Sequence, residues 1–235
     1  MIAIRESTAL RGATYTRIDT GIPINTRYRV AKRLLDLAIT LLLLPLLAIV
    51  VVVLGTFIWL DSPGPIFFRQ KRAGRYGVEF ELLKFRSMHV DCDDSVHREA
   101  YQRLLRGETL GTGADGSESY KLTGDPRITR IGRFIRKTSL DELPQLWNVL
   151  RGEMSLVGPR PPLAYEVEMY GERDLLRLSG QPGITGPWQV GGRSRVPFHE
   201  MVEMDVAYLR RQSLWEDLKL ILITVPVLLT SRGGM

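Results

Sequence analysis

The sequence predicts an α+β protein that is mostly α-helical. We expect a membrane-inserted helix and a cytoplasmic helical domain with one small β-hairpin and interfacial amphipathic helices. Three observations predict this class: an uncharged apolar run covers residues 37–60, a strand–turn–strand pattern follows it, and helical patterns fill most of the remainder. With 235 residues, the chain is long enough for one domain with its own core.

The composition favours anionic partners. Lys and Arg number 32 against 26 Asp and Glu, which gives a net charge of +6. Phosphates or an anionic lipid surface suit this balance. Nucleic acid does not, because the basic residues lie beside acids and no recognised nucleic-acid module is present. The single cysteine, Cys92, cannot form an internal disulfide, and three histidines give no zinc spacing. A reducing, cytoplasmic location is the simplest interpretation.

The apolar run at 37–60 predicts a membrane helix. It exceeds the roughly 20 residues that cross a bilayer, and it lacks the polar face of a soluble helix. Basic residues flank both ends, so the positive-inside rule gives no orientation for a straight crossing. Pro45 offers a place for the helix to break or bend. A re-entrant hairpin with both ends on one face and a single kinked crossing both fit.

The patterns along the chain divide it into three parts. Residues 1–30 form a mobile N-terminal arm, 31–62 the membrane helix, and 63–235 the domain that holds any active site. A hairpin is predicted over 66–88 with its turn at 74–77, a charged helix over 91–106, and a flexible Gly-rich loop over 107–119.

A further helix is predicted from Asp125, with Asp125 as N-cap and Pro126 at the first helical position. Basic residues then recur every three or so positions, at Arg127, Arg130, Arg133, Arg136 and Lys137. Such a face is either simply solvated or functional.

The segment 220–230 near the C-terminus is too short to span a bilayer, and it contains Pro226. With Trp215 and Lys219 at a polar boundary, it suits an interfacial helix. Packing into the core is an equally good interpretation.

Asp141 and Glu142 stand side by side behind the basic segment. Ser139 and Glu142 match a capping box, but Pro144 would then fall at the fifth helical position. With Asp141 as N-cap, Pro144 moves into the first turn, where no donor is needed. Plain capping is one interpretation. The other is chemical, because a helix N-terminus and basic neighbours keep Asp141 ionised and attract phosphate.

A carboxylate in that place can attack phosphorus, which makes Asp141 a candidate nucleophile. Glu142 can hold Mg²⁺, which shares its oxygen ligands with substrate phosphates. The GPRPP segment at 158–162 fits this chemistry, because prolines on both sides hold Arg160 extended for two parallel bonds to a phosphate. A Pro-rich surface turn is the alternative.

Taken together, these segments resemble the bacterial monotopic phosphoglycosyl transferases. The matching segments are KRLLD at 32–36, DSPGPIFFRQKRAG at 61–74, LLKFRSM at 82–88, and the blocks 125–161, 181–193 and 203–221. The resemblance covers roughly residues 30–233. Family members commonly carry a Ser-Pro pair at the helix break, whereas here Leu44 precedes Pro45.

The resemblance implies a re-entrant membrane helix and a catalytic domain on the cytoplasmic face of the bacterial inner membrane. It implies transfer of a sugar-1-phosphate from a UDP-sugar to a polyprenyl phosphate, undecaprenyl phosphate in most bacteria. The products are UMP and a polyprenyl-diphosphate-sugar, formed through a covalent aspartyl-phosphosugar. This is the first membrane step of glycoconjugate or exopolysaccharide assembly.

Carried onto this chain, the resemblance makes Asp141 the nucleophile and places Mg²⁺ at Glu142 and Asp141. It implies substrate contacts at Lys84, Arg136, Arg160, Trp188, Gln189 and Arg193. A non-catalytic membrane adaptor of a polysaccharide assembly complex is the alternative function. The sugar and the oligomeric state, including a homo-oligomer, stay open.

Overall fold

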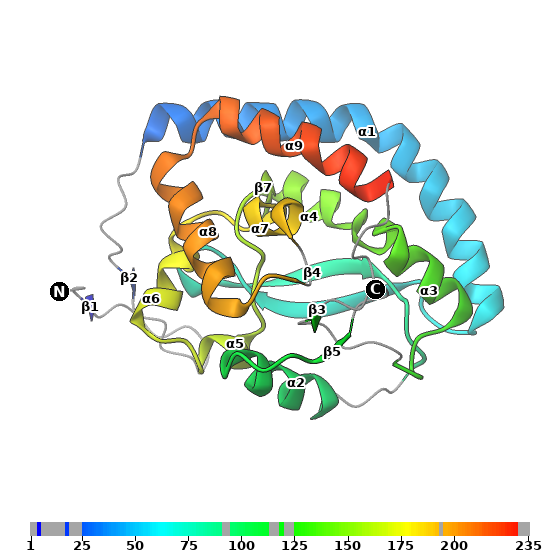
Figure 1. The fold of residues 1–235 in the computed structure, drawn as a ribbon. Helices are drawn as coiled ribbons and strands as arrows, with labels where there is room; N and C mark the ends of the chain where they lie inside the picture. Colours follow the sequence, from blue (N-terminus) through cyan, green and yellow to red (C-terminus); the bar gives the residue numbers. More distant parts are fainter. Residues whose placement is uncertain are drawn as a thin grey trace.

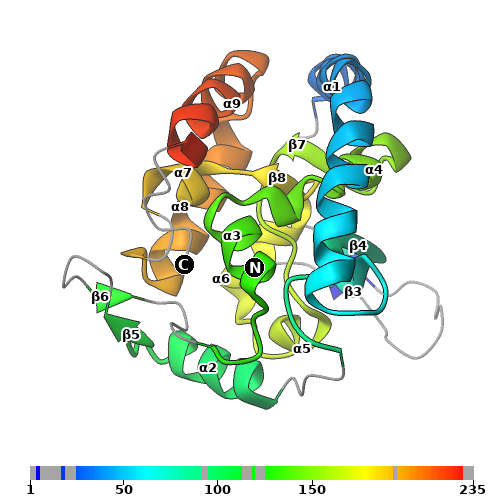
Figure 2. The same cartoon turned by 90° about the vertical axis from the view of Figure 1, so that its right-hand side faces the viewer.

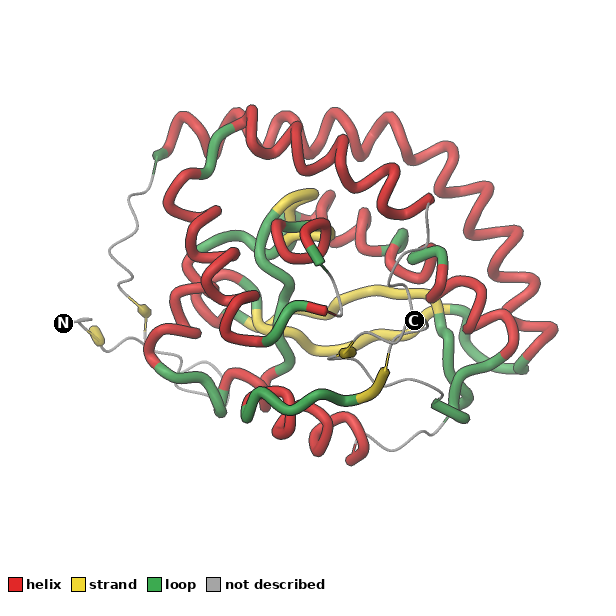
Figure 3. Tube along the Cα trace, in the orientation of Figure 1, coloured by secondary structure: helices red, strands yellow, loops and turns green. Residues whose placement is uncertain are grey.

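A computed structural model describes residues 4–5, 17–18, 25–90, 95–112, 118–119, 125–192 and 195–229 (Figure 1). Most of the described chain is helical, as Figure 3 shows, which confirms the mostly helical α+β class. The predicted N-terminal arm and Gly-rich loop fall largely outside the described residues.

The helices are α1 (Thr26–Asp61), α2 (Ser95–Leu105), α3 (Arg130–Lys137), α4 (Gln145–Arg151), α5 (Ala164–Val167), α6 (Glu172–Leu175), α7 (Pro187–Gly191), α8 (Phe198–Arg211) and α9 (Leu214–Leu229). Short 3-10 turns are η1 (Arg75–Gly77), η2 (Leu140–Glu142) and η3 (Leu176–Ser179). The strands are β1 (Ile4–Arg5), β2 (Arg17–Ile18), β3 (Phe67–Ala73), β4 (Glu79–Phe85), β5 (Gly111–Thr112), β6 (Glu118–Ser119), β7 (Ser155–Val157) and β8 (Gly183–Thr185).

Helix α1 contains the apolar run 37–60; it starts at Thr26, five residues before the predicted membrane helix, and ends at Asp61, one residue before the predicted end. Asn25 caps this start, because its side chain accepts a hydrogen bond from the Tyr28 N–H at 3.1 Å. The helix continues through Pro45, and Figure 1 shows it running along the top of the molecule before it turns down one side. Only 11% of its most apolar 18-residue window is buried. Therefore α1 is not a buried core helix, and it is apolar and long enough to cross a membrane.

Both ends of α1 are attached to the same domain. Near its start, Lys32 forms a 2.9 Å ion pair with Asp217 of α9. At its end, Asp61 accepts a hydrogen bond from the Ile131 N–H of α3 at 2.9 Å. Figure 1 shows α1 passing over the top of the domain and then down one side, and Figure 2 shows the descending part beside β3 and β4.

The predicted hairpin is confirmed. Strands β3 and β4 pair antiparallel from Phe67↔Phe85 to Ala73↔Glu79, with the turn at 74–77 as expected. Phe80 and Leu82 of β4 are buried in the largest apolar cluster, where Leu146 and Val149 of α4 pack against them. The hairpin therefore supports α4, the helix that follows the Asp141–Glu142 pair.

The strands β7 and β8 form a parallel pair that the sequence did not predict. They join the GPRPP segment to the block that contains Trp188, with Ser155 opposite Gly183 and Val157 opposite Thr185. The Gly158 N–H donates to the Thr185 carbonyl at 2.9 Å, which extends the pair. Strands of three residues are too short to show an alternating pattern, so sequence periodicity cannot reveal them.

Gly158 allows the close approach of these two backbones, which leads to a first prediction. A Cβ added at residue 158 would lie 2.2 Å from the Gln181 carbonyl oxygen and 2.9 Å from the Gly183 nitrogen. We expect Gly158→Ala to destabilise the protein by about 1–3 kcal/mol, because these backbone atoms cannot move without breaking the pair. Thermal unfolding measures this loss. Gly171→Ala is the control, since its nearest atom is 3.6 Å away; an equal loss in both variants would contradict the explanation.

The predicted helix start at Asp125 and Pro126 is wrong. Helix α3 begins at Arg130, and its N-cap is Thr129, whose side chain accepts from the Gly132 N–H at 2.9 Å. The Asp125 carboxylate instead accepts from both the backbone N–H and the guanidinium of Arg127. This local bonding competes with the helix and leaves residues 125–128 as a turn.

The predicted capping roles of Ser139 and Asp141 are also wrong. Ser139 adopts a left-handed conformation with φ of 56°, and its side chain makes no capping bond. Asp141 lies inside the 3-10 turn η2, and Pro144 occupies the N-cap position of α4. The reversal of the chain at Ser139 places the acidic pair on a short turn between α3 and α4.

The C-terminal segment is helical through Pro226 and divides into two faces. Asp217 and Leu220 are buried against the domain, whereas Trp215 is 75% exposed and Leu222 is also exposed. Core packing therefore accounts for one face of α9 and leaves an apolar face uncovered in the described structure.

Candidate active site

Glu142 is the point at which three distant segments meet. Its Oε1 accepts a hydrogen bond from Lys84 Nζ at 2.8 Å and another from Arg160 Nη1 at 3.2 Å. Lys84 comes from β4 and Arg160 from the loop after β7, while Glu142 itself ends η2. The structure thus brings together Glu142, Lys84 and Arg160 from the residues that the resemblance implied.

The charges around Glu142 leave a positive excess. Burial by itself would raise the pKa of Glu142, but the charges of Lys84 and Arg160 outweigh it and hold that pKa well below its usual range. Glu142 is therefore ionised at neutral pH. Lys84 and Arg160 together carry one positive charge more than Glu142, and this excess offsets the neighbouring Asp141 carboxylate that a phosphate would otherwise meet. The side-chain exposure rises from 14% for Lys84 to 22% for Glu142 and 37% for Arg160, so Arg160 is the outermost of the three.

Asp141 lies next to Glu142 on the same turn and is partly exposed. The residues on either side of the pair, Leu140 and Leu143, pack into an apolar cluster with Ile58 of α1 and Ile135 of α3. This packing fixes the turn, and both Asp141 and Glu142 stay partly exposed.

The loop that carries Arg160 is held from behind by Arg72. The buried Arg72 guanidinium donates to the Pro161 carbonyl at 3.1 Å, and the Ala73 N–H donates to the Pro162 carbonyl at 2.9 Å. Burial, together with the charge of Arg160, lowers the pKa of Arg72 to about 10. Sequence reasoning missed Arg72. A basic residue at an inward-facing position of a strand was the available signal.

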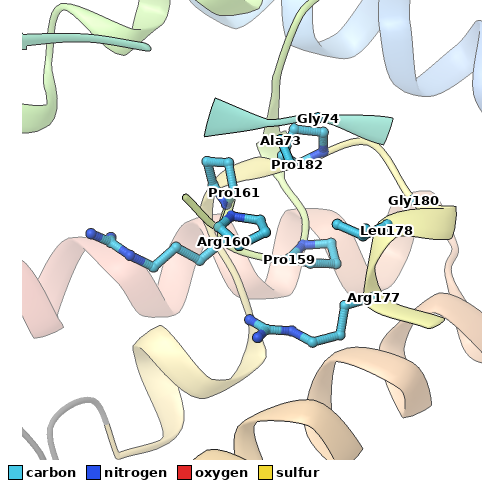
Figure 4. Close-up of a pocket in the computed structure, with 10 residues that line it drawn as sticks. Ala73, Gly74, Pro159, Arg160, Pro161, Arg177, Leu178, Gly180 and Pro182 are labelled. Carbon is cyan, nitrogen blue, oxygen red and sulfur yellow. The ribbon is translucent and has the colours of Figure 1, made fainter. Parts of the chain in front are cut away.

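A small pocket lies behind the same loop, lined by Pro159, Pro161, Gly74 and Arg177 among others (Figure 4). In this view the Arg160 side chain extends away from the prolines. The carboxylates of Asp141 and Glu142 do not line the pocket. It separates the Arg160 loop from η3 and is not the site of the acidic pair.

Trp188 and Gln189 lie on α7, away from the contacts of Glu142. The Trp188 indole nitrogen lies near the buried Asp205 without reaching hydrogen-bond geometry. Asp205 pairs with Arg177 at 2.8 Å, and burial raises the pKa of Asp205 to about 6 against the opposing charge of Arg177. This buried ion pair joins η3 to α8 beneath the Trp188 side chain of α7, and it was not predicted from the sequence.

Three other predicted contacts have different outcomes. The Gln189 side chain lies close to Gly186, since a Cβ added there would be 2.6 Å from its Oε1. Arg136 lies in the last turn of α3, and its charge adds to the Arg127 bond that lowers the pKa of Asp125. Arg193 lies outside the described residues.

Metal ligands are few at this site. Across the described ranges, no group of three or more His, Cys, Asp or Glu side chains is placed to hold an ion. Asp141 and Glu142 supply two neighbouring carboxylates, and Mg²⁺ often binds one or two carboxylates plus substrate phosphates and water. The pair therefore fits Mg²⁺ only if a phosphate substrate supplies further oxygen ligands.

Comparisons with known proteins identify the family. The model of the bacterial sugar transferase family matches residues 27–231. The chain is 46% identical over 206 residues to the galactosyl transferase CpsE of Streptococcus agalactiae, which covers 87% of this chain and 43% of that protein.

Two other relatives are similar over comparable lengths. Identity is 45% to the UDP-galactose-lipid carrier transferase of Erwinia amylovora, over 88% of this chain and 42% of that protein. It is 40% to the undecaprenyl-phosphate galactose phosphotransferase of Salmonella typhimurium, with the same two shares. The chain thus spans about two fifths of the length of these relatives. Since the match includes the hairpin, the acidic pair and the Arg160 loop, the chain belongs to the bacterial sugar transferase family.

Proposed function

We propose that the protein transfers a sugar-1-phosphate from a UDP-sugar to a polyprenyl phosphate, undecaprenyl phosphate in most bacteria. The observation that carries this proposal is the adjacent Asp141 and Glu142 with two cations, Lys84 and Arg160, on Glu142. The names of the relatives supply the substrate classes, a UDP-sugar donor and an undecaprenyl phosphate acceptor. The product, a polyprenyl-diphosphate-sugar, is a starting point for glycan or exopolysaccharide assembly.

The reaction has two balanced steps at one phosphorus atom. In the first, a carboxylate oxygen of Asp141 bonds to the β-phosphorus of the UDP-sugar. The bond from that phosphorus to the bridging oxygen breaks, and UMP leaves with the electron pair. In the second step, a phosphate oxygen of the polyprenyl phosphate bonds to the same phosphorus, and the Asp141 carboxylate leaves unchanged.

Lys84, Glu142 and Arg160 prepare the site for the charge of the diphosphate. The attacking carboxylate and the diphosphate repel each other, so cations must lie near the transferred phosphorus. Arg160 is the outermost cation and is suited to a two-bond contact with phosphate. Glu142 fixes its direction, and Lys84 keeps Glu142 ionised and in place.

We also propose a role for Mg²⁺, with Asp141 and Glu142 as its ligands together with substrate phosphates. When bound, the ion neutralises part of the diphosphate charge. Removal of divalent metal with EDTA is expected to slow UMP release at least about a hundredfold, the equivalent of roughly 3 kcal/mol. Added Mg²⁺ restores the rate. A rate that is unchanged in EDTA would contradict the metal ligand role.

For α1 we propose a re-entrant insertion, with the catalytic domain on the cytoplasmic face of the inner membrane. Its two ends contact one domain, whereas a crossing would separate them by the roughly 30 Å of the hydrocarbon core. Basic residues flank both ends, and the positive-inside rule then places both on the cytoplasmic side.

Exposed apolar side chains are what this insertion would bury in lipid. They occur along the middle of α1, at Leu42, Leu46, Ile49 and Val52. Exposed aromatic residues on neighbouring helices, Phe134, Trp147 and Trp215, suit the interface with headgroups. A shallow insertion would place Asp141 near the plane of the lipid phosphates.

The test uses the protein in lipid nanodiscs with Mg²⁺, undecaprenyl phosphate and a panel of UDP-sugars. One UDP-sugar is expected to give UMP and a lipid-linked sugar diphosphate. Without acceptor, a β-phosphate label should appear on Asp141 by peptide mapping. If the panel gives no UMP release, the adaptor function is favoured instead. Label on another residue would refute the role of Asp141.

A further inference from the structure

The helix that precedes the catalytic pair, α3, is capped at its far end by α1. Every α-helix starts with backbone N–H groups that lack partners within the helix. Here Asp61, the last residue of α1, accepts from the Ile131 N–H at 2.9 Å, and Thr129 accepts from the Gly132 N–H. The carboxylate also matches the positive end of the helix dipole. The start of α3 is thus attached to the C-terminal end of α1.

The helix that follows the pair, α4, is capped at its C-terminal end by Arg33, which lies near the start of α1. The Arg33 guanidinium donates to the Val149 carbonyl and, at 2.8 Å, to the Leu150 carbonyl. These carbonyls belong to the last turn of α4, where a helix lacks internal donors and favours positive charge.

The catalytic pair lies between these two attachments. Helix α3 ends at Lys137, η2 carries Asp141 and Glu142, and α4 starts at Gln145. Figure 2 shows α3 and α4 on the side of the domain along which α1 runs.

We propose that Arg33 and Asp61 are positioning residues for the transfer. By capping the outer ends of the two helices that flank the pair, they fix Asp141 relative to the membrane helix. This inference rests on the proposed function. The polyprenyl phosphate is confined to the membrane surface, so the depth of Asp141 decides whether the two meet. The UDP-sugar is dissolved and reaches Asp141 at any depth. Displacement by about 1 Å can slow a reaction about a hundredfold.

The experiment compares acceptors that are and are not confined to a bilayer. Asp61→Leu and Arg33→Met remove the caps, whereas Asp61→Asn and Arg33→Lys keep an acceptor or a donor. Matched controls are Glu203→Gln and Arg173→Met, since these residues form an exposed ion pair away from α1. For each protein we would measure UMP release without acceptor, transfer to undecaprenyl phosphate in nanodiscs, and transfer to a water-soluble short-chain polyprenyl phosphate.

We expect Asp61→Leu and Arg33→Met to slow transfer in nanodiscs by about tenfold to a hundredfold. UMP release without acceptor and transfer to the short-chain acceptor should stay close to the values of the unaltered protein. The conservative variants should recover most of the nanodisc rate, and the controls should match the unaltered protein. If Asp61→Leu does not fold, Asp61→Ala serves for the same comparison, because alanine also lacks an acceptor.

Two results would overturn this inference and leave the proposed function intact. One is an equal loss of rate in all three assays, which indicates a merely structural role for Asp61 and Arg33. The other is no loss of rate in nanodiscs. A failure of the proposed function looks different, because the unaltered protein would then release no UMP with any acceptor.

Discussion

Asp141→Asn is expected to abolish transfer and the covalent intermediate together. The amide has nearly the size of the carboxylate but lacks the charge and the nucleophilic oxygen. Loss of a nucleophile costs on the order of 10⁴- to 10⁶-fold in rate, so the residual activity should lie near the detection limit. UMP release and protein-bound label from a UDP-sugar labelled at its β-phosphate measure both effects.

The protein offers a clear control for this prediction. Asp174 caps the short helix α6 by accepting from the Gly171 N–H, and it takes no part in the site. Asp174→Asn should keep the rate and the label of the unaltered protein. Thermal unfolding of Asp141→Asn should also be close to normal, because Asp141 is partly exposed and its apolar neighbours hold the turn. Persistent label on Asp141→Asn would show that another residue is the nucleophile.

Lys84→Met is expected to reduce the transfer rate and to change its pH dependence. Removing a preorganised charge contact commonly costs about 10²- to 10³-fold in rate. Lys84 also opposes the effect of burial on Glu142, so its loss raises the pKa of that carboxyl. A carboxyl with a higher pKa takes up its proton at higher pH. As pH falls, the activity of Lys84→Met should therefore decline earlier than that of the unaltered protein.

Two variants separate this effect from a general loss of charge. Lys84→Arg keeps a cation beside Glu142 and should keep the normal pH profile. Lys71→Met removes an exposed lysine on β3, and both its rate and its profile should be normal. A Lys84→Met enzyme that is slower but has an unshifted acid limb would show that Lys84 acts on the substrate and not through Glu142.

The elements that the sequence predicted well are those with long, uniform patterns. The apolar run of α1 and the alternating strands of the hairpin extend over many residues, so local errors do not change their assignment. The turn at Ser139 was missed because a left-handed backbone conformation is normally expected at glycine or asparagine. Here the residue that adopts it is a serine. That single turn decides whether Asp141 caps α4 or lies before it.

The candidate site was predictable in composition but not in arrangement. Arg160 came from the GPRPP segment and Lys84 from the resemblance, and their shared contact with Glu142 depends on tertiary packing that spacing does not reveal. Arg33 and Asp61 were overlooked for the same reason. Their partners lie 117 and 70 residues further along the chain, whereas helix caps are normally sought among neighbours.

The attachment of both ends of α1 to one domain also has a consequence for how the protein is inserted into the membrane. With a re-entrant helix, no hydrophilic segment has to be carried through lipid, so the folded domain can settle on the bilayer from the side on which it is made. Reporter proteins fused before Asn25 and after Leu229 would then share one compartment, and an added N-terminal domain would face the same substrates as the catalytic one.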